Sequence, residues 1–195
     1  MGRVSQAQAQ ANRQRVVATA SRMFREKGTG VSVADLMKAV GLTHGGFYKQ
    51  FASKEDLIDE ATAYAFDEFG KVTLAESSED HETARRALVE RYLSVSHRDH
   101  AGRGCPVAGL AADLGREPDQ AARAHDVYLN GVRNSAAQLA TGDDDGMAQF
   151  CTMVGALVLA RATRGNPLSE KLLQAARVAL LASGARQSDS QQRTE

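Results

Sequence analysis

Two capping boxes on either side of a glycine constrain the fold of this chain more than any other feature. In Ser32-x-x-Asp35 and in Ser53-x-x-Asp56, a serine precedes an acidic residue by three positions. This spacing lets the serine hydroxyl accept a backbone N–H that has no partner in the first turn of a helix. Gly41 lies between the two boxes, where a glycine ends a helix. The stretch therefore predicts two helix starts separated by a tight turn.

Residues 43–51 predict a further, short helix between these two starts. Phe47 and Phe51 are four positions apart and would both face inward, whereas most of the remaining residues are polar or glycine. A helix that reads DNA must be short, apolar on its inner face and polar on the face toward the major groove. The stretch 32–57 therefore predicts a helix-turn-helix DNA-binding motif.

Gly45 and Gly46 stand in the first turn of this predicted helix. Each glycine in a helix interior costs about 1 kcal/mol relative to alanine. Two interpretations are open: the missing side chains let the backbone approach DNA closely, or glycine is simply tolerated in a first turn. In both cases the helix presents few side chains to the bases.

The segment before the motif predicts one basic helix. Apolar residues recur at helical spacing over residues 13–27, and Gly28 occupies the position just after the last turn. Residues 1–12 are polar and low in complexity, and they predict a flexible arm. Such an arm is either an untethered terminus or a contact to the minor groove or to phosphates.

Charge is distributed unevenly along the chain. The 195 residues carry no net charge, with 24 Lys and Arg against 24 Asp and Glu. Residues 1–54 hold nine of the basic residues and two of the acidic ones, a net charge of +7, so the remainder carries −7. A basic first quarter on an acidic body is expected when only one end of a molecule meets phosphate.

The rest of the chain also predicts helices. Helical periodicity and alanine recur beyond residue 55, and the chain has only three prolines and no tryptophan, which favours helices over a sandwich or barrel. We predict an all-α fold with a three-helix DNA-binding domain over residues 1–54, a larger helical domain over 55–184 and a disordered tail over 185–195. Within the larger domain, residues 84–95 predict one helix, followed by a loop over 97–104.

The last two predicted helices, over about 147–163 and 168–183, carry more apolar surface than one short domain needs. Their many small residues permit helices to pack closely, and a four-helix bundle across a two-fold axis would bury that surface. These helices therefore predict a homodimer. The alternative is that they form only the core of a monomer.

The motif also resembles a known family. The residues that carry the resemblance are Ala34-Asp35-Leu36, Ala39-Val40-Gly41-Leu42, Gly45, Phe47-Tyr48, Phe51 and Ser53-Lys54-Glu55. They are similar to the helix-turn-helix of the tetracycline-repressor (TetR) family of transcriptional regulators. The similarity covers roughly the first third of the chain. The rest is similar only in its length, in being helical and in the stretch 155–163.

The resemblance implies which residues contact DNA. Tyr48 and Lys54 would hold phosphates, Lys54 beside a helix N-terminus that favours anions, and the Ser32 hydroxyl would add a contact of the same kind. Gly46 departs from the family pattern, which more usually has threonine or alanine there, so base contacts would fall on other side chains. The predicted DNA contacts are Ser32, Thr43, His44, Gly45, Tyr48, Lys49 and Lys54.

The resemblance further implies a small, largely apolar effector bound within the helical body. Cys105 begins a predicted short helix and follows two arginines, a setting that stabilises a thiolate. It is therefore either a redox sensor or a small buried residue, and each other candidate for the pocket wall is also explained as plain core. The candidates are Tyr64, Tyr92, Cys105, Leu110, Tyr128, Phe150 and Met153.

We predict a cytoplasmic, nucleoid-associated repressor that binds a palindromic double-stranded DNA operator as a homodimer and releases it when an effector binds. Two distant cysteines, no secretory leader and no apolar run near the ~20 residues of a membrane span support this location. No cofactor, metal or catalytic motif stands at a recognisable spacing, so none is expected. The alternatives are a nonspecific architectural DNA-binding protein and, more remotely, a helical enzyme that acts on a small apolar substrate.

Overall fold

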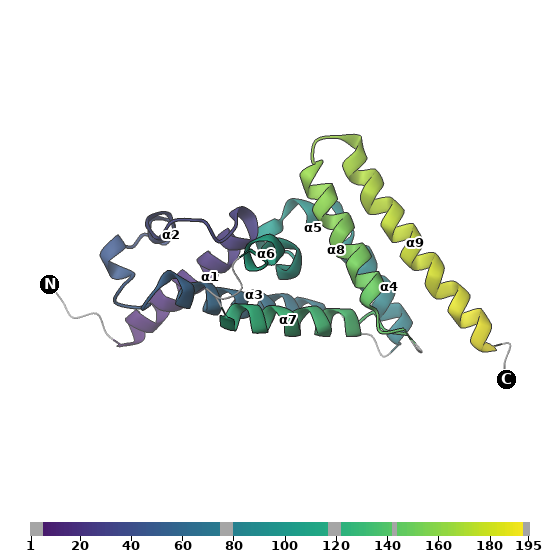
Figure 1. The fold of residues 1–195 in the computed structure, drawn as a ribbon, viewed down its shortest axis with the longest axis horizontal. Coiled ribbons are helices and arrows are strands. Elements are labelled where there is room, and N and C mark those ends of the chain that lie inside the picture. The colour runs from purple at the N-terminus through teal and green to yellow at the C-terminus, as the bar shows by residue number, and fades with distance from the viewer. Residues whose placement is uncertain (1–5, 75–79, 117–121, 142–143, 193–195) are drawn as a thin grey trace. The chain divides into compact units, whose positions relative to one another are not determined.

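The computed structural model describes residues 6–74, 80–116, 122–141 and 144–192, and these residues form helices and no β-strand (Figure 1). The predicted all-α fold is confirmed. The helices of the described residues are α1 (Gln6–Lys27), α2 (Val33–Ala39), η1 (His44–Gly46), α3 (Lys54–Leu74), α4 (His81–Tyr92), α5 (Val95–Asp99), η2 (Ala101–Arg103), α6 (Pro106–Leu114), α7 (Ala122–Ala137), α8 (Met147–Ala162) and α9 (Pro167–Gln192), of which η1 and η2 are 3₁₀ helices.

The chain divides into two compact units. The first comprises residues 1–69 and 101–130, and the second comprises residues 70–100 and 131–195. The first unit thus holds the predicted DNA-binding motif together with a segment from the middle of the chain. The predicted division after residue 54 stays a prediction, and the two compact units are divided at other positions.

Both predicted capping boxes are present in the first unit. The Ser32 hydroxyl accepts the backbone N–H of Asp35, and the Ser53 hydroxyl accepts that of Asp56, each at 3.1 Å. Gly41 has a φ of +70°, in the left-handed region that favours glycine, just beyond the end of α2. The local signals in the sequence therefore set the start and the end of α2 as predicted.

One hydrophobic core joins the helices of the first unit. Phe24 of α1, Leu36 of α2 and Leu57 of α3 are each 1% exposed or less. Leu110 and Leu114 of α6 belong to the same core. Burying a side chain of this size stabilises the fold by about 1.5–3 kcal/mol. The support of the DNA-binding motif therefore includes α6, which is distant from the motif in the sequence.

Helix α6 lies close against α1. A Cβ at Gly109 of α6 would lie 3.1 Å from the Cα of Arg25, so the missing side chain permits this approach. Arg25 is buried, and its guanidinium donates to the carbonyl of Gly104 (3.0 Å) and to the carboxylate of Glu68 on α3 (2.5 Å). A buried arginine is tolerated here because its charge is paired and its N–H groups have acceptors.

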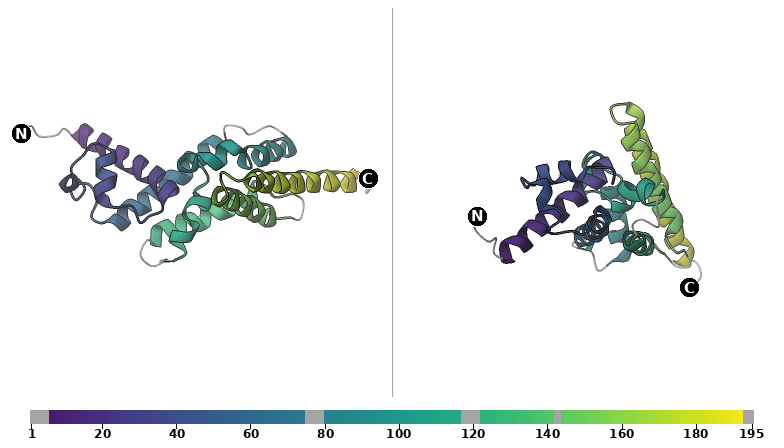
Figure 2. Two further views of the ribbon diagram at one scale, coloured as in Figure 1. Left: turned by 90° about the horizontal axis from the view of Figure 1, so that it is seen from above. Right: turned by 60° about the vertical axis from the view of Figure 1, so that its left-hand side comes forward.

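The second unit is built on α8 and α9, which lie side by side and run in opposite directions (Figure 2). Met153 and Leu157 of α8, Leu173 of α9 and Val89 of α4 are buried. The unit therefore has an apolar core of its own.

A buried polar chain joins α5, α8 and α9 in this unit. The guanidinium of Arg98 donates to the hydroxyl of Ser169 (2.9 Å), which donates to the carbonyl of Ala160 (2.7 Å). Arg161 donates to the carbonyls of His97 (3.1 Å) and Arg98 (3.3 Å). Because these groups satisfy one another, the polar atoms can be buried at the turn between α8 and α9.

Both ends of the chain are more helical than the sequence predicts. α1 begins at Gln6, so residues 6–12 are helical where an arm is predicted, in keeping with the high helix propensity of Gln and Ala. α9 continues to Gln192, so the predicted disordered tail is helical as far as that residue. A helix that has started gains one hydrogen bond for each added residue, and this segment contains no proline to stop it. Residues 1–5 and 193–195 lie outside the described residues.

The predicted helix over residues 84–95 is interrupted. α4 ends at Tyr92, and Ser94 starts α5 by accepting the backbone N–H of His97 at 3.1 Å. A serine hydroxyl competes with the helix for backbone partners in this way. The predicted loop over 97–104 consequently contains the end of α5 and all of η2.

Candidate nucleic-acid interface

Residues 43–51, called the reader turn below, form a short helical turn and not the continuous helix that the sequence predicts. η1 spans His44–Gly46, and hydrogen-bonded turns follow, in which the N–H of Phe51 donates to the carbonyl of Phe47 (3.0 Å). Two successive glycines explain the difference, because each costs about 1 kcal/mol in a helix relative to alanine.

An aromatic pair fixes the inner face of the reader turn. Phe47 is 0% exposed and Phe51 is 3% exposed, and their rings stack at 5.3 Å. Both belong to the core that includes Leu36 and Met37 of α2. Because this face is buried, the remaining residues of the turn are held outward.

The outer face of the reader turn carries most of the predicted DNA contacts. Thr43, His44, Gly45 and Lys49 are exposed, and Tyr48 is 63% exposed. The ring of Tyr48 meets the ring of His44 edge-on at 5.7 Å. Hydroxyl, imidazole and ammonium groups in one exposed turn can reach both base edges and phosphates.

The two predicted phosphate contacts at helix starts differ in what they can donate. The Ser32 hydroxyl donates its one hydrogen to the carboxylate of Asp35 (2.7 Å) while it accepts the backbone N–H of that residue. It is thereby occupied as a helix cap. Lys54 is the half-exposed first residue of α3, beside backbone N–H groups that favour an anion. Lys54 is therefore the better placed of the two.

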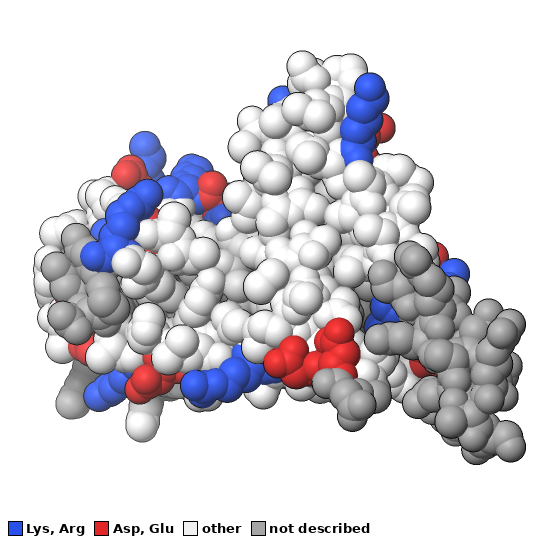
Figure 3. Space-filling view, turned by 45° about the vertical axis from the view of Figure 1, so that its right-hand side comes forward, with Lys and Arg blue, Asp and Glu red and all other residues white. Residues whose placement is uncertain are grey.

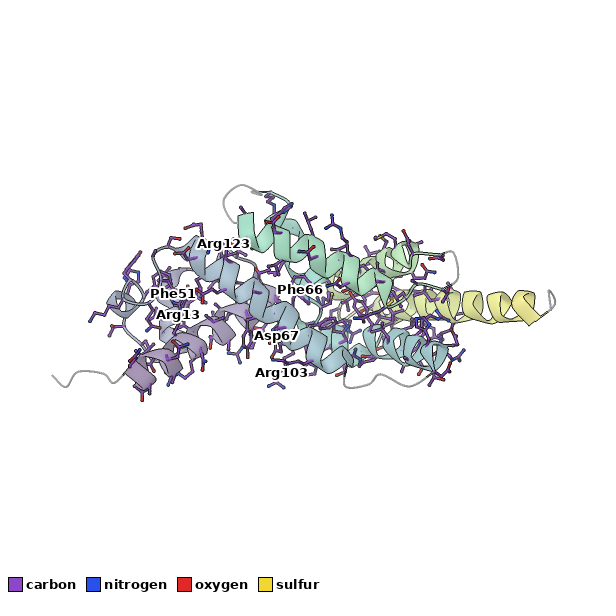
Figure 4. The ribbon with its side chains drawn as sticks, turned by 90° about the horizontal axis from the view of Figure 1, so that it is seen from below. Arg13, Phe51, Phe66, Asp67, Arg103 and Arg123 are labelled. Carbon is purple, nitrogen blue, oxygen red and sulfur yellow. The ribbon has the colours of Figure 1, made fainter. Side chains whose placement is uncertain are left out.

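Arg13 of α1 holds the reader turn from within the protein. Its guanidinium lies 4.3 Å from the centre of the Phe51 ring, where a cation–π contact forms (Figure 4). It also donates to the carbonyl of Gln50 and to the carboxylate of Glu60. This arginine contributes to the +7 charge of the first quarter, yet it is engaged inside the unit.

Two further arginines of α1 are engaged in the same way. Arg15 donates to the carbonyl of Val40 at the end of α2 (2.8 Å), and Arg25 pairs with Glu68. The sequence predicts a basic helix here, in a first quarter that carries a net charge of +7. In the structure these three arginines instead brace α2, the reader turn and α3, so the lysines carry more of the charge that is available to DNA.

The predicted pocket residues are divided between the two units. In the first unit, the hydroxyl of Tyr128 donates to the carbonyl of Val107 (3.2 Å). Burial, together with the nearby Cys105, raises the pKa of Tyr128 to about 12. The phenol is therefore neutral at physiological pH. Of the predicted set, Cys105, Leu110, Tyr92, Phe150 and Met153 are buried, Tyr128 is half-buried and Tyr64 is 38% exposed.

Cys105, the predicted redox sensor, is the residue before the first turn of α6 and is 0% exposed. An oxidant would reach its sulfur only if α6 moved, so the role of sensor stays a prediction. The second cysteine, Cys151, is exposed on α8.

The two predicted dimer helices expose apolar side chains. Val158 and Leu159 of α8 are 42% and 54% exposed, and Leu168 and Val178 of α9 are 49% and 55% exposed. The upper part of the molecule in Figure 3, formed by these two helices, is mostly neither basic nor acidic. A Cβ at Gly155 of α8 would meet no atom within 4 Å, so no packing within the unit requires that glycine.

Among the described residues, no three His, Cys, Asp or Glu side chains are placed to hold a metal ion together. None of the helices in the described part of the chain is long and apolar enough to span a membrane. The feature that stands out for function is the helix-turn-helix with its exposed reader turn. This arrangement is typical of DNA-binding proteins with an all-helical body.

Comparison with known proteins agrees with this class. Residues 16–61 match the family described as bacterial regulatory proteins, tetR family. The HTH-type transcriptional regulator AcrR of Shigella flexneri is 32% identical over 75 residues, which are 38% of this chain and 35% of AcrR. This chain therefore matches about one third of the length of that relative.

Solved structures share the fold over nearly the whole chain. A TetR-family regulator from Agrobacterium tumefaciens superposes with a TM-score of 0.72 at 18% identity and covers 88% of this chain and 97% of its own. AibR in complex with isovaleryl coenzyme A and operator DNA superposes with a TM-score of 0.57 at 15% identity, over 87% and 98% of the two chains. The match to the tetR family thus covers the helix-turn-helix part of the chain, residues 16–61, and the solved structures share the fold of the rest.

Proposed function

We propose that this chain is a homodimeric transcriptional repressor that binds a palindromic operator and releases it when a small, largely apolar molecule binds the helical body. The observation that carries the proposal is the reader turn, in which Phe47 and Phe51 are buried while polar side chains are held outward. A surface of this kind matches the major groove of DNA.

Within the reader turn, we assign base contacts to Thr43, His44 and Lys49 and phosphate contacts to Tyr48. Lys54 adds a phosphate contact, and Gly45 allows the backbone to approach the DNA. Arg, Asn and Gln, the usual bidentate readers of bases, are missing from the first turn. Much of the affinity therefore comes from the DNA backbone, and binding is sensitive to salt.

The homodimer is supported by the apolar face of α8 and α9. Glycine inside a helix costs about 1 kcal/mol relative to alanine, and nothing within the unit explains that cost at Gly155. A helix of a second copy lying close against α8 explains both this glycine and the exposure of Leu159. Two-fold symmetry would then place two reader turns ~34–36 Å apart, or a related multiple, on successive major grooves.

Release by an effector is supported by the family and by the fold that this chain shares with AibR, which was solved with isovaleryl coenzyme A and operator DNA. The Tyr128 hydroxyl, which donates to the carbonyl of Val107, would accept a hydrogen bond from the effector in an otherwise apolar pocket wall. Effector and DNA would favour different spacings of the two reader turns. Because both act on the equilibrium between these spacings, binding of the effector would lower the affinity for DNA.

Selection from random DNA tests the proposal. The wild-type protein should enrich a palindrome, and binding to it should be measurable by fluorescence anisotropy at moderate salt. Lys49→Ala should weaken this binding or change its base preference, whereas Arg86→Gln, which removes an exposed charge on α4, should leave it unchanged. Enrichment of no preferred sequence would favour an architectural DNA-binding protein instead.

A further inference from the structure

We propose that a groove between the end of α1 and α2 is a second contact to the DNA backbone, made by Lys27 and Lys38. This inference rests on the proposed DNA-binding function and extends it beyond the reader turn. It assigns to these two lysines the phosphate contact that the family resemblance implies for Ser32.

The groove has a volume of about 620 Å³ and lies within the first unit. Met23 and Lys27 of α1 line one side, Ser32 and Lys38 line the side of α2, and Gly30 lies in the connection between the helices. Met23 is buried, so the groove has an apolar floor with a cation on each side. A sugar–phosphate backbone, with apolar deoxyribose faces between charged phosphates, fits such a surface.

The two lysines are available to an anion. Both are exposed, and within the described residues neither takes part in an ion pair or a side-chain hydrogen bond. In contrast, three arginines of α1 donate to carbonyls or carboxylates of the same unit: Arg13, Arg15 and Arg25. These three arginines are thus engaged within the unit, while Lys27 and Lys38 stay accessible as compact point charges of the kind that binds phosphate.

The acidic side chain of the groove is already partnered. Asp35 accepts the hydroxyl of Ser32 at 2.7 Å, which holds its carboxylate at the start of α2. The same bond consumes the one hydrogen that the Ser32 hydroxyl has to donate. A phosphate in the groove would therefore be bound by the lysines and not by the serine.

The missing side chain of Gly30 allows the DNA backbone to approach the groove closely. It is exposed, its φ lies outside the left-handed region, and a Cβ there would meet no atom within 4 Å. Neither backbone strain nor packing within the protein requires glycine at this position. The missing side chain leaves the groove open between Lys27 and Lys38. Gly45 in the reader turn shows the same combination of exposure and empty surroundings.

Continuity with the reader turn selects DNA as the occupant. α2 begins at the groove and ends at Ala39, and residues 40–42 connect it to residues 43–51. A duplex held by the reader turn exposes phosphates along both sides of the major groove, and proteins commonly contact these phosphates to fix their register.

The test compares the salt dependence of operator binding for the wild-type protein and for Lys27→Gln/Lys38→Gln. Each phosphate contact contributes about −0.9 to the slope of log Kobs against log salt concentration, so the double variant should lose about 1.8 from the magnitude of that slope. Its base preference should stay unchanged, because phosphate contacts carry no sequence information. Phosphate ethylation should also interfere with wild-type binding at positions where it no longer affects the variant.

Arg86→Gln/Arg164→Gln is the matched control, since it removes two exposed positive charges from the second unit and should leave the slope unchanged. Gly30→Val keeps the charge but narrows the groove, and it should weaken binding with no change in circular dichroism. An unchanged slope for the double lysine variant would overturn the inference. Absence of any sequence-specific complex with the wild-type protein would instead refute the proposed function itself.

Discussion

Gly45 is exposed in the reader turn, and a Cβ there would meet no atom within 4 Å. At Gly46 a Cβ would make ordinary contacts, 3.6 Å from Met37 and 3.6 Å from Thr43. Neither glycine has a positive φ. Alanine thus fits the folded protein at both positions, and of the two interpretations that the sequence leaves open, close approach to DNA gives Gly45 a reason to be glycine.

Gly45→Ala should therefore stabilise the protein and weaken its binding to the operator. We expect the free energy of unfolding to rise by about 0.4–1 kcal/mol, because alanine restricts the unfolded chain. Gly46→Ala is the control, with a similar gain in stability and a smaller loss of affinity, since that residue is less exposed. Chemical denaturation and fluorescence anisotropy measure the two effects. Unchanged operator affinity for Gly45→Ala would contradict the close approach.

His97 of the second unit is a half-buried histidine that remains neutral in the folded protein at physiological pH. Burial lowers its pKa from 6.5 to about 4, although its Nδ1–H donates to the carbonyl of Tyr92 at 2.7 Å. Its ring also lies 4.6 Å from the ring of Tyr92. Protonating this imidazole in the folded protein is therefore unfavourable.

The free energy of unfolding should fall as the pH drops from 6.5 to about 4, because the unfolded chain then binds a proton that the folded chain excludes. The loss should reach about 3 kcal/mol at most, at about 1.4 kcal/mol for each unit of pKa. His97→Asn should flatten this dependence, and His100→Asn, which changes an exposed histidine, should not. Urea titrations across this pH range measure the free energy of unfolding. If it depended on pH equally in the His97 variant and the wild type, His97 would not be the group responsible.

At the scale of elements, the sequence predicts what depends on neighbouring residues and misses what depends on distant ones. The start of α2 after its cap Ser32 and its end before Gly41 follow from local hydrogen bonding and backbone geometry. The partners of Arg13 and Arg25 are 37 and 79 residues away, at Gln50 and Gly104, and no local pattern identifies them. Their role in bracing the motif therefore becomes visible only in the fold.

Arg25→Gln should destabilise the first unit by about 3 kcal/mol, because it leaves buried acceptors without a charged donor. Arg22→Gln is the matched control on the same helix, and it should have little effect because Arg22 is exposed. Thermal unfolding followed by circular dichroism compares the two variants. Equal stability of the variants would show that the contacts to Gly104 and Glu68 do not hold α1, α3 and α6 together.

The reader turn shows a further limit of prediction from sequence. The residues that face inward, Phe47 and Phe51, are identified correctly by their spacing. The length of the helix is predicted wrongly, because two successive glycines destabilise a continuous helix by more than the flanking residues stabilise it. The helix predicted over 84–95 is likewise divided by a local preference, because Ser94 caps the start of α5.

At the scale of the whole molecule, the proposed dimer determines how the reader turns are used. A single reader turn with few base contacts binds DNA weakly, and two turns on one rigid dimer add their contributions at a fixed spacing. The apolar residues that α8 and α9 leave exposed are the part of the surface that a second copy would cover.

Leu159→Glu/Val178→Glu should convert the protein into a folded monomer, because it buries two unpaired carboxylates in the proposed interface. Operator affinity should fall strongly, while the weak binding to an isolated half-site should change little. Gln138→Glu, at an exposed polar position of the same unit, is the control. Sedimentation velocity measures the oligomeric state. A double variant that remained a dimer would refute the proposed interface.

The central claim is that residues 43–51 read a palindrome, and the most direct measurement is the affinity of the wild-type protein for its selected palindrome at increasing separations of the two half-sites. We expect tight binding at one separation, a steep loss when a few base pairs are inserted, and loss of the tight complex in Lys49→Ala. Equal affinity at all separations and for unrelated DNA would contradict this claim.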